Sequence, residues 1–508
     1  MLSSADPIRA AMKERPASAL TLLDAAIVVY LVLPLLIFCG WFKPPVAAVL
    51  AALILYATWQ MLAGTRWREF AVRPRAIAGI VLLSLGWTAL GGVGHFFYAN
   101  SDWLIRDAVL RDLTATPWPP QYPFEGDFPL ILRAPIAFYM PAAVVGWLAG
   151  PAVGDFALYL WTALGFALFL CAVTTLFQTP RQRWIAVLLM IAFGGLDLVG
   201  WILVKGDIPR PSQHIEAWNY LAQYSSNSTL LFWVPNHALP AWLGTTLILR
   251  LWRQVDLARI APLMTATIPL WSPLAAIGLF PFYVAGLAWR RDYRVLFAIR
   301  TSFPFMAMAL VVARYVTLDS QAIPGGWAFL DRPFGEYALE YLSLCIIEFG
   351  LVAWALYRLK AYDLVLTIAV AVLLLLPLYK FGGANDLVMR GSIPALTVLA
   401  LATVRPLADP GRSSGWRYAL MAVLFVGAVG AAHEPTRALV LPAWPMKGRT
   451  LTQSQEMGSD DAFPSLPPHY VARLNQAGLA GMLRDPTPVQ PYPAAPANGA
   501  SAPATSRP

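Results

Sequence analysis

Acidic and basic side chains gather at residues 91–107, directly after a long apolar run. Asp102 and Arg106 are four residues apart, as are Asp107 and Arg111, so each pair would meet on one side of a helix. A carboxylate can accept a proton or bind a cation, whereas an arginine can bind an anion. An ordinary surface helix with two weak ion pairs would show the same spacing. The apolar runs on both sides favour a functional site, because they place these acids at a membrane face.

A second polar cluster lies between residues 214 and 237. Its amide, acidic, imidazole and indole groups are of the kinds that hydrogen-bond sugar hydroxyls and stack on sugar rings. The residues expected to bind a substrate here are His214, Glu216, Asn227, Trp233, Asn236 and His237. In an outer loop the same residues could also simply be solvated.

The third cluster is formed by Lys380, Asp386 and Arg390, at the start of an apolar run. Arg390 could hold a phosphate through two parallel hydrogen bonds, and Lys380 could hold it as a point charge. Both cations could instead anchor the chain at the membrane interface.

Composition indicates the elements that carry these clusters. The chain is 58% hydrophobic and 13% charged, with a mean hydropathy of +0.58. Apolar runs of about twenty residues recur, which is the length needed to cross a bilayer. The net charge of +9 does not indicate a nucleic-acid partner, because the Lys and Arg residues lie mostly in short loops. The three cysteines fall inside apolar runs and have no metal-ligand spacing.

We therefore predict an all-α polytopic membrane protein with about thirteen transmembrane helices. The predicted spans are 23–42, 45–63, 76–95, 154–177, 184–204, 236–251, 258–271, 273–289, 295–313, 339–357, 362–378, 391–404 and 416–432. The pair 258–271 and 273–289 is expected to be broken by its prolines. The basic N-terminus, residues 1–22, is expected to be cytoplasmic and to precede an uncleaved first span.

Residues 136–149 decide the topology of the first large outer loop. The segment is apolar, but it is short for a span and contains Pro141. If it crossed the membrane, Arg181 and Arg183 would lie outside, against the positive-inside rule. We expect it to lie in the interface or to dip into the membrane. The inner loops then carry roughly twice as many Lys and Arg residues as the outer loops.

This topology places the large outer loops at about 96–153, 205–235 and 314–338. Most acidic and histidine residues outside the spans then share one face, which marks a functional site. Asp197 lies within a span and is expected to face the bundle interior and to contribute to substrate binding. The tail, 433–508, is rich in Pro and Ala and is predicted to be largely disordered and outside, with no assigned chemistry.

The order of these parts resembles the GT-C class of integral-membrane glycosyltransferases. More narrowly, several short motifs are similar to a family of uncharacterised bacterial polytopic proteins related to that class. They are Asp102-Trp103, Trp118-Pro119, Gly195-Leu196-Asp197, residues 223–227, residues 232–237, Asn385-Asp386 and Met389-Arg390. The likeness covers roughly residues 76–405.

The resemblance implies transfer of a sugar from a polyprenyl-phosphate-linked donor to a lipid, glycan or protein acceptor, at the outer face of a bacterial inner membrane. Asp102 would be the catalytic base, with Asp107 as its nearest rival. The cation pair of the third cluster would hold the donor phosphate, and His95 and Arg106 would contact the substrate. The expected partners are the lipid-linked donor and membrane lipids.

Two other functions remain open on the sequence. In a transporter or lipid flippase, the same acids and cations would line a translocation path. A non-catalytic subunit would scaffold a polysaccharide assembly system. There is no nucleotide-binding, metalloprotease or serine-hydrolase motif and no clear internal repeat. The carboxylates could bind a divalent cation, although no ligand set demands one.

Overall fold

The computed structural model describes residues 20–491 apart from positions 71, 125, 134, 253, 255, 291–295, 298, 384, 410–413, 447, 459–465 and 467–468. The predicted cytoplasmic segment 1–19 therefore lies outside the described residues. Within them, six helical segments are long and apolar enough to cross a membrane, and the chain is a predominantly helical membrane protein. These segments are Leu22–Trp41, Pro44–Leu62, Pro151–Thr175, Pro180–Lys205, Phe334–Arg358 and Gly415–Val440.

Each segment predicted to span the membrane contains a helix of the bundle, although many of these helices are shorter than 18 residues. The helices of these predicted spans are α2 (Leu22–Phe38), α3 (Pro44–Leu62), α4 (Pro74–Leu90), α7 (Pro151–Thr175), α8 (Pro180–Ala192), α9 (Asp197–Lys205), α11 (Pro235–Leu251), α12 (Asp256–Trp271), α13 (Pro273–Arg290), α14 (Ser302–Val316), α15 (Phe334–Cys345), α16 (Leu351–Arg358), α17 (Leu364–Leu375), α19 (Ile393–Ala408) and α20 (Gly415–Ala431). The predicted break in α12 and α13 is wrong. Both helices continue through Pro262, Pro269 and Pro281.

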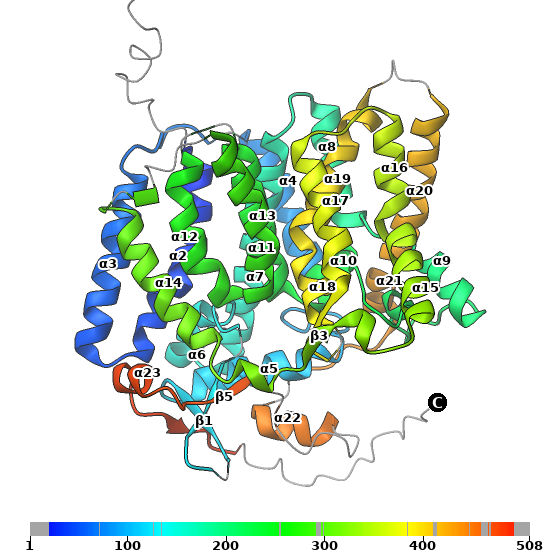
Figure 1. Cartoon of the computed structure of the whole chain (residues 1–508). Coiled ribbons are helices and arrows are strands. Elements are labelled where there is room, and N and C mark those ends of the chain that lie inside the picture. Colours follow the sequence, from blue (N-terminus) through cyan, green and yellow to red (C-terminus); the bar gives the residue numbers. More distant parts are fainter. Residues whose placement is uncertain are drawn as a thin grey trace, which may run out of the picture.

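The elements within residues 102–132 and 451–488 gather at one end of the bundle, at the bottom of Figure 1. The remaining helices are α5 (Asp102–Ala115), α6 (Met140–Ala149), α10 (Asn227–Trp233), α18 (Asp386–Gly391), α21 (His433–Val440), α22 (Leu451–Gly458) and α23 (Ala477–Met482). The strands are β1 (Pro120–Tyr122), β2 (Leu130–Leu132), β3 (Gly325–Trp327), β4 (Tyr379–Phe381), β5 (Val471–Arg473) and β6 (Thr487–Pro488). The sequence analysis did not predict these strands.

The C-terminal tail is more ordered than its composition suggests. Strands β5, β2, β1 and β6 form one sheet in that order, so the tail pairs with the first large loop on both sides. Figure 1 shows the orange and red tail against the cyan loop. Backbone pairing with the loop explains the difference, because it satisfies hydrogen bonds that this Pro- and Ala-rich segment cannot make alone. The prediction of a largely disordered tail is therefore wrong for these described parts.

The predicted outer and inner loops lie at opposite ends of the bundle. At the lower end Arg473 pairs with Asp319 at 2.7 Å, next to the sheet. At the upper end Arg250 pairs with Asp24 at 2.7 Å, and the amide of Leu22 donates to the carbonyl of Glu69.

The segment 136–149 becomes α6, a ten-residue helix packed against α5 and α7. Gly150, with φ of 97°, reverses the chain directly into α7. A Cβ atom on Gly154 would lie 2.9 Å from the Cα of Gly146, so the two helices approach too closely for a larger residue. α6 is therefore too short to span and lies against the first half of the bundle.

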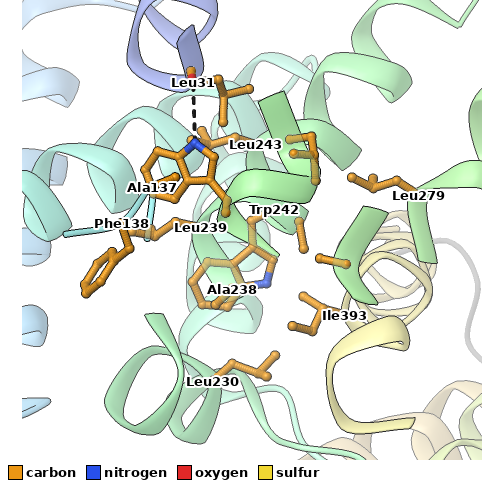
Figure 2. Close-up of a cluster of buried hydrophobic side chains, with 14 of the residues drawn as sticks. Leu31, Ala137, Phe138, Leu230, Ala238, Leu239, Trp242, Leu243, Leu279 and Ile393 are labelled. Atoms are coloured by element: carbon orange, nitrogen blue, oxygen red, sulfur yellow. Dashed lines mark hydrogen bonds between the residues drawn. The ribbon is translucent and has the colours of Figure 1, made fainter. Parts of the chain in front are cut away.

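The core lies where the central helices meet. Figure 2 shows Trp242 of α11 among apolar side chains that include Leu230, Leu279 and Ile393. The dashed line in that figure joins the indole of Trp271 to the carbonyl of Leu31, at 3.3 Å. This close packing of aromatic and aliphatic side chains holds the central helices in place, and these helices position the polar clusters.

Candidate functional site

α5 positions the first polar cluster beneath the bundle. The indole of Trp103 and the amide of Asn100 both donate to the carbonyl of Phe232, which anchors the start of the helix to α10. On its next turn Arg106 pairs with Asp102 at 3.0 Å, as the spacing predicted. Arg106 also donates to Asn236 at 3.0 Å.

Exposure separates the two carboxylates proposed as catalytic. The side chain of Asp102 is 41% exposed, whereas that of Asp107 is 2% exposed. Asp107 does not form the predicted pair with Arg111, which instead bonds Asp112. Asp102 can therefore reach a substrate, and Asp107 faces the protein.

Asp107 belongs to a buried group with His95 and Asp155. The Nε2 atom of His95 lies 3.1 Å from a carboxylate oxygen of Asp107, and its Nδ1 atom lies 2.9 Å from the carbonyl of Trp444. Burial would lower the pKa of His95, but the hydrogen bond and charge of Asp107 raise it above its ordinary value. Burial likewise raises the pKa of Asp107, against the opposing effects of His95 and Arg106.

The same three residues could hold a divalent cation. One ligand atom from each lies within 4.8 Å of the others. An oxygen of Asp107 and one of Asp155 are buried without a hydrogen-bond donor among the described residues. His95 would donate its Nδ1–H to the Trp444 carbonyl, which leaves Nε2 to bind the cation. Metal-binding histidines commonly donate their other ring N–H in this way. The donor set fits a cation, although the sequence analysis assigned no metal ligands.

Arg390 and Asp386 come to the same end on α18 and pair at 2.5 Å. The charges of Arg390 and Arg106 both act on His237, which is buried and lies 2.7 Å from the hydroxyl of Ser272.

Two residues of the tail, His469 and Tyr470, interact electrostatically with charged groups of both the first and the third cluster. Burial and the charge of Arg390 lower the pKa of His469 to about 4, while Asp386 and Asp102 oppose the change. Burial raises the pKa of Tyr470, and the charges of Arg106 and Arg390 oppose it. The charges of the first and third clusters thus act on the same two tail residues, and we call Asp102, Arg106, Asp386, Arg390, His469 and Tyr470 together the outer-end site.

Lys380 does not join the outer-end site. Its Nζ atom lies 3.8 Å from Asp331, and it lines a separate cavity of about 170 Å³ with Asn219 and Arg332. The predicted cation pair is therefore divided between two places.

The second cluster forms a buried network of its own. Glu216 is 3% exposed and accepts hydrogen bonds from the Ser226 amide and the Thr229 hydroxyl. His214 bonds Glu434 at 3.3 Å, and the indole of Trp233 donates to Glu434 at 2.8 Å. These side chains bond one another rather than facing a substrate space.

Asn227 and Asp197 are likewise buried. Asn227 donates to the carbonyl of Leu189 at 3.2 Å. Asp197 is 0% exposed, at the start of α9, and interacts with Glu348. Asp197 faces the bundle interior, as predicted.

Sequence reasoning missed four acids or histidines of these sites. Asp155 and Glu348 lie inside apolar runs, and an acid within a span is a signal that could have singled them out. Glu434 and His469 lie in the tail, where the composition gave no such signal.

No protein-family model, curated protein or solved structure matches the chain. The site is therefore interpreted from its own chemistry.

Proposed function

We propose that the protein is a membrane glycosyltransferase of the GT-C type, which moves a sugar from a polyprenyl-phosphate-linked donor to a lipid, glycan or protein acceptor. One observation carries this proposal. A partly exposed carboxylate, Asp102, shares the outer-end site with two cations, Arg106 and Arg390. A base and phosphate-binding cations are the groups that this transfer needs.

In this proposal Asp102 accepts the proton of the acceptor hydroxyl as its oxygen attacks the anomeric carbon. The bond from that carbon to the phosphate oxygen breaks, and its electron pair leaves with the polyprenyl phosphate. Arg390 stabilises the developing phosphate charge, after exchanging part of its contact with Asp386. Arg106 holds Asp102 in place through their 3.0 Å pair.

The proposal includes the membrane placement. The thirteen helical segments would span a bacterial inner membrane, with the N-terminus inside and the outer-end site outside. The burial of α6 against α5 and α7 supports a first outer loop that stays on one side. A divalent cation on His95, Asp107 and Asp155 would add positive charge behind Arg106.

A transporter is the second candidate, because a cavity of about 1570 Å³ lies at the opposite end of the bundle. It is lined by the ends of α7, α11, α13 and α19 and the start of α17, with Arg250, Lys360 and Arg405 among its residues. A cavity of this size would suit one end of a translocation path.

The deciding experiment compares purified variants in lipid nanodiscs, supplied with radiolabelled polyprenyl-phosphate sugars and a membrane-lipid acceptor extract. Asp102→Asn should keep donor binding and lose transfer by roughly a hundredfold or more. Asp127→Asn is the control, because Asp127 is an exposed acid of the same loop. Near-normal transfer by Asp102→Asn would remove this residue from the mechanism. Label that crosses sealed vesicles without forming a new glycoside would favour the transporter.

A further inference from the structure

Two helix irregularities meet inside the bundle, away from the outer-end site. The apolar segment Pro180–Lys205 is interrupted between α8 and α9 at residues 193–196. Opposite it, the segment Phe334–Arg358 contains a π-helical turn, Ile346–Gly350. The amide of Leu196 donates to the carbonyl of Ile347 at 3.1 Å, which joins the two irregular stretches. Such departures from regular helix commonly occur at functional sites.

A pair of carboxyl groups lies at this junction. Asp197 is the first residue of α9 and is 0% exposed, and Glu348 lies in the π-helical turn and is 2% exposed. The indole of Trp218 donates to Oε1 of Glu348 at 2.8 Å. Both oxygens of Asp197 and Oε2 of Glu348 have no N–H or hydroxyl donor among the described residues. The two carboxyl groups interact with each other.

The backbone is shaped to admit Glu348. A Cβ atom on Gly195 would lie 1.9 Å from Oε2 of Glu348, so only glycine fits beside this carboxyl group. Gly427 of α20 closes the other side, where a Cβ atom would lie 2.5 Å from the Gly194 carbonyl. The pair is therefore packed tightly between three segments.

The charged groups around Asp197 and Glu348 do not neutralise two negative charges on this pair. The charges of Glu216 and His214 act on Asp197, and Tyr224 faces Glu348.

On α21, Glu434 and Arg437 pair with each other at 3.0 Å. The charge of His214 acts on Asp197 and on Glu216, whereas Glu348 interacts with the like charges of Asp197 and Glu216. Three ionised carboxylates would be costly in this buried setting.

We propose that Asp197 and Glu348 form a proton-binding site, in which one proton is held between the two carboxyl groups at neutral pH. A proton fits the close packing at Gly195, whereas a metal cation would need several further oxygen ligands. The amide of Gln223 lies 2.9 Å from Glu216 and 3.0 Å from His214, whose side chain is partly exposed. Loss of the proton would leave two like charges at the interruption, so α9 would separate from the π-helical turn.

Infrared spectroscopy of the full-length protein in nanodiscs tests the site without any activity assay. The wild type at pH 7 should show a protonated-carboxyl band that Asp197→Asn/Glu348→Gln lacks. Glu336→Gln, which alters an exposed acid of α15, should keep that band. If the double variant does not fold, Glu348→Gln alone is measured instead. Its amide oxygen can still accept the Trp218 hydrogen bond, so this variant should fold, and its protonated-carboxyl band should be weaker than that of the wild type.

Two outcomes would overturn the proposal. One is an unchanged band in folded variants that lack either acid. The other is thermal stabilisation of the wild type by Na⁺ at constant ionic strength, lost in the double variant, because the site would then bind a cation instead. Neither outcome depends on whether the protein transfers sugars.

Discussion

At the residue scale, position on one helix separates acids of the same type. Asp102 and Asp107 are five residues apart on α5, and one faces the outer-end site while the other faces His95 and Asp155. The difference follows from helix geometry, because a step of five residues turns a side chain well away from its predecessor. The exposed acid suits proton transfer, and the buried acid suits cation binding.

Arg390 gives the sharpest residue-scale prediction. Arg390→Ala should abolish binding of the lipid-linked donor, and Arg390→Lys should impair it, because lysine cannot form the two-pronged phosphate contact. Binding is measured with a fluorescent polyprenyl-phosphate sugar in nanodiscs. Arg210→Ala, in an exposed part of an outer loop, is the control.

The ion pair between Arg390 and Asp386 requires a second control variant. Arg390→Ala leaves Asp386 without its 2.5 Å partner, which could repel the donor. Asp386→Asn/Arg390→Ala removes that charge and should still fail to bind. Normal donor binding by the double variant would show that Arg390 only neutralises Asp386.

At the element scale, the tail helix α22 is held to α5 by one buried acid. Asp112 accepts hydrogen bonds from the Leu451 amide at 2.9 Å and from the Tyr122 hydroxyl at 3.0 Å. Burial raises the pKa of Asp112 to about 6, against these hydrogen bonds and the charge of Arg111. The docked state therefore holds a proton that the undocked state releases near pH 4.

Docking of α22 should weaken as the pH rises. Because α22 contributes to the burial that raises this pKa, the contribution of Asp112 to docking is fully present below about pH 4 and is lost as the pH passes about 6. Hydrogen exchange of the Leu451 amide, corrected for its intrinsic pH dependence, should be faster at pH 8 than at pH 5. Asp112→Asn should remove most of this difference and Asp127→Asn should keep it. Equal protection of the wild type at both pH values would contradict the assignment.

At the scale of the whole molecule, the loops divide between two ends. The first large loop and the tail pair in one sheet, and the Trp444 carbonyl contacts His95, so these parts lie together. The turn between α7 and α8 lies at the other end, where Arg183 donates to the carbonyl of Phe177.

Reporter fusions test the orientation of the two ends. Fusions at residues 120 and 440 should be active outside, and a fusion at residue 181 should be active in the cytoplasm, because basic residues favour the inner loops. The wild-type chain with a reporter at its N-terminus is the reference. Cytoplasmic activity at residue 120 would overturn the placement of the outer-end site.

The sequence by itself determined the features that depend on local composition and spacing. Apolar runs identified the helical membrane protein, and the four-residue spacing gave the pair of Asp102 and Arg106. Each of these follows from burial or helix geometry within one segment. The predicted proline breaks were wrong because neighbouring helices support α12 and α13 around their prolines.

Only the tertiary structure decided which segments meet. The pairing of the tail with the first loop, the group of His95 with Asp155, and the contact of Asp197 with Glu348 each join residues far apart in the chain. It also separated Lys380 from Arg390, although they are ten residues apart. Such contacts depend on how helices pack and where backbone hydrogen bonds are completed, which no single segment encodes.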